Sequence, residues 1–187
     1  MLRPGPNQVN ETHEDGRIGF LMGKWRGDSM PLETFIKRSR INASAEALYR
    51  WHAEPGALER LTPPGERLRV VSRTDGIEDG ARVAFRVGPL RLLWVAEHCD
   101  VIPGRQFRDV QIRGPFRHWA HTHRFLADGP SACYLVDEIV YEFPFGRLGR
   151  FLAGGFVRRK IERLFDYRHR LTAEAFPATD TTSPASR

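Results

Sequence analysis

The chain has 187 residues and a formal net charge of +6, with 41% hydrophobic and 28% charged residues, which is typical of a globular protein with a sizeable core. Its longest apolar run, at 92–96, is far too short to cross a bilayer, and no signal peptide is recognisable. Without a secretion signal, Cys99 and Cys133 are expected to be reduced thiols. The expected compartment is therefore the cytoplasm.

The two ends of the chain differ from its middle. Residues 1–32 are rich in Gly, Asn, Asp and Pro without sustained periodicity, which predicts a flexible leader. Met30 precedes the first clear strand and is a candidate for the biological start. Residues 177–187 have low complexity and predict a disordered tail, so that one domain is expected at 33–176.

The first elements of this domain are a strand at 33–41 and two short helices. Ser44 is a suitable N-cap for a helix at 45–53, and two prolines end a second helix at 55–61. Gly- and Pro-containing turns then separate six further strands, as in an antiparallel meander. These strands are expected at 67–74, 80–88, 90–102, 105–113, 116–127 and 132–143.

Apolar residues recur at helical spacing over 148–176, which predicts a long amphipathic helix packed on the sheet. Seven strands, two short helices after the first strand and a long last helix describe an α+β helix-grip fold. In this fold a seven-stranded curved antiparallel sheet wraps around the C-terminal helix. A cavity lies between the sheet and the helix.

The positive charge is concentrated in the last helix. Residues 147–170 contain eight basic residues against Glu162 and Asp166, an excess that equals the net charge of the whole chain. Such a patch could attract nucleic acid or an anionic membrane, but it is also the ordinary solvated face of an amphipathic helix. No RNA- or DNA-binding motif accompanies it, so no nucleic-acid partner is expected.

The stretch RGPFRHWAHTHRF at 113–125 carries three histidines, and strand alternation divides them between two faces. Trp119, His121, His123 and Phe125 share the aromatic face, which is the better candidate for the interior. By the same alternation, Asp137 and Tyr141 belong to an otherwise apolar face of 132–143, and Glu97 to one of 90–102. On 105–113 the choice stays open: Phe107, Asp109 and Gln111 oppose Arg108, Val110 and Ile112.

Ionisable groups on apolar faces need partners, because an unpaired buried charge costs several kcal/mol. We therefore expect these carboxylates and histidines to meet one another or a ligand. His-x-His directs both imidazoles the same way, as in some zinc or iron sites, with Glu97, Asp109 or Asp137 as a third ligand. The spacing is common and fixes no third ligand, so no metal is expected.

Hydrogen bonding between the histidines and neighbouring carboxylates is the more ordinary interpretation. Alternatively, His121 or His123 with Asp109 would form an acid–base pair for a cyclisation or dehydration. The sequence contains neither a nucleophile motif nor a phosphate-binding loop, and no cofactor is expected. Arg60 could face a ligand or anchor a buried acid, and Arg168 could neutralise an inward carboxylate or extend into solvent.

Several separated motifs resemble those of the ligand-binding SRPBCC proteins, in the START/polyketide-cyclase helix-grip superfamily. They are RLTPP (60–64), WVAEH (94–98), F-x-D-x-Q-x-x-GPF-x-x-W-x-H-x-H-x-F (107–125), D-x-x-x-Y-x-x-P (137–144) and F-x-YRH (165–169). The resemblance covers about 33–175. In relatives a Trp commonly follows the two prolines, whereas Gly65 stands here, which leaves the role of that position in doubt. Similar domains occur alone or fused to a nucleotide-sugar-epimerase-like domain, and at this length no such partner domain is expected.

The resemblance implies a deep apolar cavity for a hydrophobic small molecule or lipid. The superfamily mixes carriers, hormone receptors, cyclases and hydroxylase subunits, so it names no reaction. The expected function is noncovalent binding of a hydrophobic or amphipathic ligand by a monomer or homodimer, and whether the protein also transports this ligand stays open. The expected ligand-binding residues are Arg60, Trp94, Glu97, Phe107, Asp109, Gln111, Trp119, His121, His123, Phe125, Asp137, Tyr141 and Arg168.

Two alternatives stay open at this point. One is an enzyme of the cyclase or dehydratase kind that uses His121 or His123 as a base. The other is a lipid-presenting protein that docks on anionic membranes through Arg158, Arg159 and Lys160.

Overall fold

The computed structural model describes residues 32–74 and 76–178. The predicted leader and tail, and the candidate start at Met30, lie outside these residues except for Leu32, Pro177 and Ala178. The elements follow the predicted order: β1 (Glu33–Ile41), α1 (Ala45–Ala53), α2 (Ala57–Arg60), β2 (Leu68–Arg73), β3 (Arg82–Val87), β4 (Leu92–Ile102), β5 (Gln106–Arg113), β6 (His118–Ala127), β7 (Cys133–Glu142) and α3 (Gly146–Ala175).

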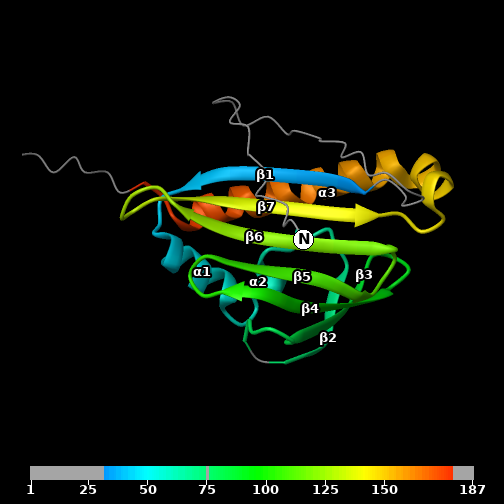
Figure 1. The fold of residues 1–187 in the computed structure, drawn as a ribbon, viewed down its shortest axis with the longest axis horizontal. Helices are drawn as coiled ribbons and strands as arrows, with labels where there is room; N and C mark the ends of the chain where they lie inside the picture. Colours follow the sequence, from blue (N-terminus) through cyan, green and yellow to red (C-terminus); the bar gives the residue numbers. More distant parts are fainter. Residues whose placement is uncertain (1–31, 75, 179–187) are drawn as a thin grey trace, which may run out of the picture.

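The seven strands form one antiparallel sheet in the order β1-β7-β6-β5-β4-β3-β2. Strands β2 to β7 form a meander, and β1 pairs with β7 although the two are about 100 residues apart in the sequence. Figure 1 shows α3 running behind β1 and β7, with α1 and α2 grouped at one end of the curved sheet. The predicted helix-grip fold is confirmed.

Local signals account for the first helix. The hydroxyl of Ser44 accepts a hydrogen bond from the backbone N–H of Ala47 at 3.2 Å, as expected of an N-cap. Leu48, Tyr49 and His52 are the buried residues of α1. The helix therefore turns one face toward the sheet, and a histidine belongs to that face.

Two apolar clusters form the core, and polar residues separate them along β6 and β7. One cluster, near α1, includes Phe125 of β6 and Leu135 of β7. The other, beneath α3, includes Ile139 and Tyr141 of β7, with Trp119 of β6 packed against it. The positions between the two clusters are occupied by His121, His123 and Asp137, all of them buried.

Candidate functional site

A cavity of about 690 Å³ lies between α3 and the concave side of β3 to β6. Most of its wall is apolar, including Phe85, Trp94, Phe107, Trp119 and Leu164. The polar side chains in the wall that matter for its chemistry are His98, Asp109, His121, His123 and Arg168. The size and composition are those of a pocket for a small organic molecule, since such pockets measure about 300–1,000 Å³.

Strand register brings the polar groups together. His98 of β4 is paired with Asp109 of β5, and Asp109 is paired with His121 of β6. One strand further, His123 is paired with Asp137 of β7. His169, from α3, reaches the same place from the other side. We call these six residues the histidine–aspartate cluster: His98, Asp109, His121, His123, Asp137 and His169.

Asp137 is the centre of this cluster and is 2% exposed. One of its oxygens, Oδ1, lies 2.9 Å from Nε2 of His121 and 2.7 Å from Nδ1 of His123. The other, Oδ2, lies 2.7 Å from Nε2 of His169, whose Nδ1 is 2.8 Å from the hydroxyl of Ser39. An ionised carboxylate only accepts hydrogen bonds, so Nε2 of His121 and Nε2 of His169 donate to it, whereas Nδ1 of His123 lies close to Oδ1 without the alignment of a hydrogen bond.

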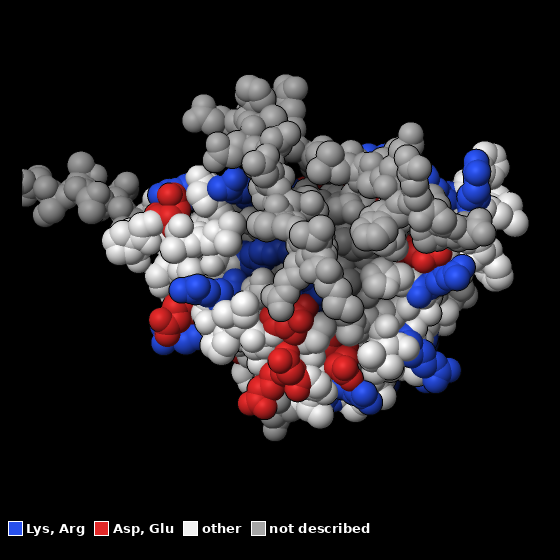
Figure 2. Space-filling model, viewed as in Figure 1, with Lys and Arg blue, Asp and Glu red and all other residues white. Residues whose placement is uncertain are grey.

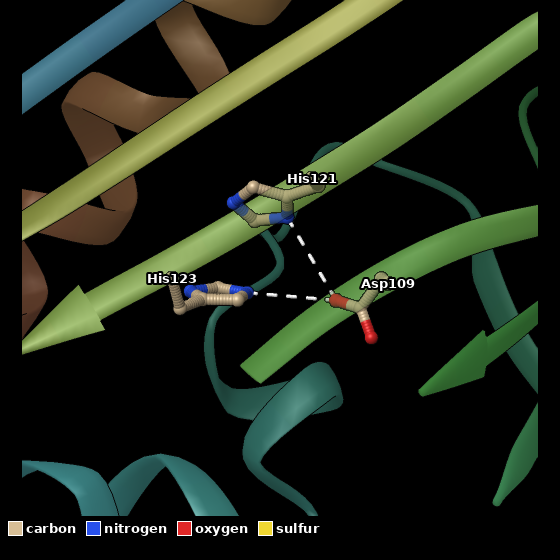
Figure 3. A group of neighbouring side chains, drawn as sticks. All are labelled: Asp109, His121 and His123. Atoms are coloured by element: carbon tan, nitrogen blue, oxygen red, sulfur yellow. Dashed lines mark ion pairs between the residues drawn. The ribbon is translucent and has the colours of Figure 1, made fainter. Parts of the chain in front are cut away.

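Asp109 stands on the cavity side of the two β6 histidines. Its Oδ2 is 3.8 Å from Nδ1 of His121 and 3.5 Å from Nε2 of His123, and Figure 3 shows both rings directed at this one oxygen. Its Oδ1 contacts Nδ1 of His98 at 2.6 Å. The carboxylate is thus held from β4 while it faces the histidines of β6.

The environment separates the pKa values of the two neighbouring histidines. Burial, followed by the positive charge of His123, lowers the pKa of His121 to about 4. Burial also opposes the charged form of His123, but the charges and hydrogen bonds of Asp137 and Asp109 outweigh it and raise its pKa to about 9. Near neutral pH the cavity therefore presents a neutral imidazole beside a protonated one.

The carboxyl groups of Asp109 and Asp137 both stay ionised because histidines surround them. Burial would raise the pKa of Asp109, but His123 and His98 hold it well below its usual range. Burial would likewise raise the pKa of Asp137, but its three histidine partners hold this pKa well below the ordinary value. The cluster is therefore a compact arrangement of opposite charges.

Arg168 adds a second cation to the cavity wall. Its Nε–H donates to the backbone carbonyl of Leu61 at 3.1 Å, and its guanidinium lies 5.0 Å from the centre of the Phe165 ring. Burial lowers the pKa of Arg168, while the negative charges of Asp137 and Asp109 act in the opposite direction. Arg168 therefore lies in the cavity wall, and its hydrogen bond goes to a backbone carbonyl and not to an acid of the cluster.

The structure places the predicted site residues in three groups. Trp94, Phe107, Asp109, Trp119, His121, His123 and Arg168 line the cavity. Asp137 lies behind the lining and reaches it through His121 and His123. The remaining five, outside the cavity lining, are Arg60, Glu97, Gln111, Phe125 and Tyr141.

The expected orientation of β4 was wrong, and with it the position of Glu97. The even positions Trp94 and His98 face the cavity, while Glu97 pairs with Arg82 of β3 at 2.7 Å. A register shift after Cys99 explains the error, because the left-handed backbone at Asp100 (φ 53°) reverses the alternation. Beyond it the odd position Val101 packs on the core near α1.

Gln111 fixes a turn instead of facing a ligand. Its amide nitrogen donates to the carbonyl of Phe116 at 2.7 Å, and its amide oxygen accepts from the N–H of Phe116 at 3.3 Å. The side chain crosses the turn so closely that a Cβ on Gly114 would collide with it. The Q-x-x-G-P-F motif therefore has a structural explanation.

Arg60, Phe125 and Tyr141 also have structural roles. Arg60 neither faces the cavity nor anchors a buried acid of the cluster: its guanidinium lies 4.1 Å from the Trp51 ring centre and bonds to the Trp51 carbonyl. Phe125 belongs to the core near α1. The hydroxyl of Tyr141 donates to Glu33 at 3.1 Å, and its ring belongs to the core beneath α3.

Sequence reasoning missed three histidines. His98 was lost through the reversed alternation of β4. His169 could have been found, because it continues the buried helical spacing Ile161–Phe165 and lies in the YRH motif. His52, on the buried face of α1, lies with its ring centre 6.0 Å from that of His123, and burial and the charge of His123 lower its pKa to about 3.

The open end of the cavity is bordered by exposed apolar side chains. Leu90, Leu92 and Phe156 line the cavity and are also exposed to solvent; we call these three residues the mouth. On the same helical stretch, Leu148, Phe151 and Leu152 are exposed as well. Among the described residues, no helix is long and apolar enough to cross a membrane.

Residues 41–166 match the model of the family described as polyketide cyclase / dehydrase and lipid transport. The chain belongs to this family. Membership implies that the chain binds a small hydrophobic ligand or has cyclase activity, and it does not choose between them. A comparison with curated proteins finds no match.

Solved structures show the same fold at low sequence identity. The family member resembles the Zhui aromatase/cyclase from Streptomyces sp. R1128 (TM-score 0.62, 14% identity, covering 77% of this chain and 93% of that one). It resembles a START superfamily protein from Mycobacterium smegmatis (TM-score 0.56, 15% identity, covering 76% of this chain and 98% of that one). It also resembles a nucleoside-diphosphate sugar epimerase from Corynebacterium glutamicum (TM-score 0.59, 24% identity, covering 74% of this chain and 28% of that one). This chain thus spans little more than a quarter of that epimerase.

Proposed function

We propose that this protein binds a hydrophobic or amphipathic small molecule or lipid noncovalently in the cavity. The observation that carries the proposal is the cavity itself: about 690 Å³, largely apolar, with its polar groups gathered where β4, β5 and β6 meet. Burial of the ligand's apolar part against Trp94, Phe107 and Trp119 supplies most of the affinity.

The polar groups set the orientation of the ligand. A carbonyl or hydroxyl group fits beside His123, which is protonated near neutral pH, and Arg168 offers a second donor. A fully apolar guest would leave both cations buried without a new partner. The expected ligand therefore has an apolar body and one polar end.

Filling the cavity tests this proposal. Ala96 faces the cavity from β4, and Ala96→Phe places a ring inside it; Val95→Phe adds the same ring to the opposite face of the strand. A fluorescent apolar probe should bind the wild type and Val95→Phe, and bind Ala96→Phe at least about tenfold more weakly. Equal binding by all three would place the probe elsewhere and overturn the proposal.

An enzyme of the cyclase or dehydratase kind is the second candidate. It is favoured by the two adjacent histidines with separated pKa values, because a neutral base beside a protonated acid is the arrangement that such reactions use. In that case His121 accepts a proton from the bound molecule and His123 donates one. If the reaction is a dehydration, the product is lighter than the substrate by the mass of one water molecule.

Mass spectrometry separates the enzyme from the carrier. If His121 is a catalytic base, His121→Ala should retain the unreacted substrate, whereas the wild type carries the product. For a dehydration, the molecule bound to the variant is then heavier by the mass of one water. His118→Ala, an exposed histidine on the same strand, is the matched control. The same bound molecule in all three proteins supports binding without turnover.

The mouth supports a third candidate, delivery of the ligand at an anionic membrane. Leu148, Phe151 and Leu152 are exposed beside it, where they could enter the headgroup region. The basic residues contribute less than expected, since Lys160 pairs with Glu66 and Arg158 with Glu162. On the face seen in Figure 2, acidic side chains gather in the lower middle, whereas basic side chains are scattered over the face without forming one patch.

Liposome flotation tests this candidate. Phe151→Ala combined with Leu152→Ala should reduce flotation with vesicles that contain anionic lipid by several-fold, because apolar insertion is lost. Arg159→Ala should reduce flotation less than the double variant does, and only at low salt, because salt screens the attraction between the arginine and the anionic lipid. Flotation that is unchanged in the double variant would exclude the apolar surface as the docking site.

A further inference from the structure

We infer that Asp109, His121 and His123 form a binding site for one divalent transition-metal ion of the zinc or iron type, at the polar end of the cavity. The inference departs from the sequence-based expectation of no metal. It deepens the proposed function, because the three residues line the same cavity as the proposed ligand and His123 also serves the ligand's polar end.

The first argument is the geometry of the three ligand atoms. Nδ1 of His121, Nε2 of His123 and a carboxylate oxygen of Asp109 all lie within 4.8 Å of one another. The two nitrogens are 3.8 Å and 3.5 Å from Oδ2 of Asp109. Two ligands that are each about 2.1 Å from a tetrahedral ion are about 3.4 Å apart, so small side-chain movements would complete the site. Binding of the ion also requires that Nε2 of His123 release its proton, because a ligating imidazole nitrogen is deprotonated.

The second argument is the orientation of the His121 ring. Because Nε2 of His121 is hydrogen-bonded to Asp137, the other ring nitrogen, Nδ1, is the one directed at the carboxylate of Asp109. The 3.8 Å between Nδ1 and Oδ2 is too long for a hydrogen bond. An ion bound by both atoms would lie between them.

The third argument is the set of groups behind the three ligands. Metal-binding histidines commonly donate their second nitrogen to a carboxylate, which fixes the ring. Asp137 faces the second nitrogens of both His121 and His123, at 2.9 Å and 2.7 Å, and it is itself anchored by His169. His98 holds the other oxygen of Asp109 at 2.6 Å, so that Oδ2 is left for the ion.

The chemistry of the donors points to the kind of ion. Two imidazoles and one carboxylate suit zinc or iron(II), whereas magnesium and calcium prefer oxygen ligands. Three protein ligands leave at least one coordination position open. All three ligands line the cavity, so this position faces the space that the guest would occupy.

Cobalt and zinc titrations of the metal-stripped full-length chain test the inference. Co²⁺ should give visible absorption bands that saturate at one ion per chain, and Zn²⁺ should displace it. Asp109→Asn and His121→Ala should abolish the bands, and Asp137→Asn should weaken binding about 10–100-fold as a positioning residue. His118→Ala, on the opposite face of β6, is the control and should bind as the wild type does.

Circular dichroism checks that each variant is folded, and Asp109→Asn is close enough in shape to serve if His121→Ala does not fold. Saturation at one ion that depends on Asp109 and His121 supports the site. Absence of saturable binding, or binding that is equal in Asp109→Asn and wild type, overturns it. Binding of the apolar probe by the same metal-free sample tests the proposed function separately, since the probe requires no metal.

Discussion

The two halves of α3 have similar apolar spacing but opposite surroundings. In the second half, Ile161, Phe165 and His169 are buried against the sheet, and Phe165 is 1% exposed. In the first half Phe151 is 86% exposed, and its apolar neighbours Leu148 and Leu152 are exposed too. Helical spacing thus predicts an apolar face, but it does not reveal what covers that face.

The difference assigns separate tasks to the two halves. The second half lines the cavity with Leu164 and Arg168 and brings His169 to Asp137 of the sheet. The first half begins beyond the end of β7 in Figure 1 and borders the mouth with Phe156. We expect the second half to determine stability and the first half to determine access.

The same Phe→Ala substitution, made once in each half of α3, should give the largest difference in the free energy of unfolding. Phe165→Ala should lower the free energy of unfolding by about 3–5 kcal/mol, because it opens a cavity in the core. Phe151→Ala should change it by less than about 0.5 kcal/mol, because the ring is exposed. Urea denaturation of both variants measures the difference, and equal losses would contradict the assignment of tasks.

The polar anchor of the second half should be nearly as important. Asp137→Asn should cost about 3 kcal/mol or more, because it leaves His123 charged and buried with one acid fewer. Glu138→Gln, the next residue on β7, removes an ion pair with Arg124 that is partly exposed and should cost about 0–1 kcal/mol. Similar losses in the two variants would show that the buried cluster adds no special stability.

Hydrogen exchange should show the smallest but most local effect. Amides of the first half of α3 should exchange faster than those around Phe165, because exposed segments with few buried contacts open more easily. Uniform protection along the whole helix would indicate that something covers the first half. In that case the mouth would be closed in solution.

The fold could be predicted largely from the sequence because its signals are local. Turn residues separate the strands, Ser44 caps α1, and the apolar spacing marks α3. The pairing of β1 with β7 has no local signal, since it joins segments about 100 residues apart. It was accessible only through the order of elements that the helix-grip fold requires.

The site was harder to predict because alternation fails at irregular backbone. On β6 and β7 the alternation is unbroken, and His121, His123 and Asp137 meet as expected. On β4 the bulge at Asp100 reversed it, so that Glu97 was chosen in place of His98. A polar residue on a strand also does not reveal whether it serves a ligand or a turn, as Gln111 shows.

Native mass spectrometry of the freshly purified chain tests the central claim most directly. We expect a population that carries one additional small hydrophobic molecule, which is released on collisional activation and is absent from Ala96→Phe. The Val95→Phe variant should retain it. Bare protein in every preparation, even after incubation with a lipid extract, would contradict the claim that the cavity holds a guest.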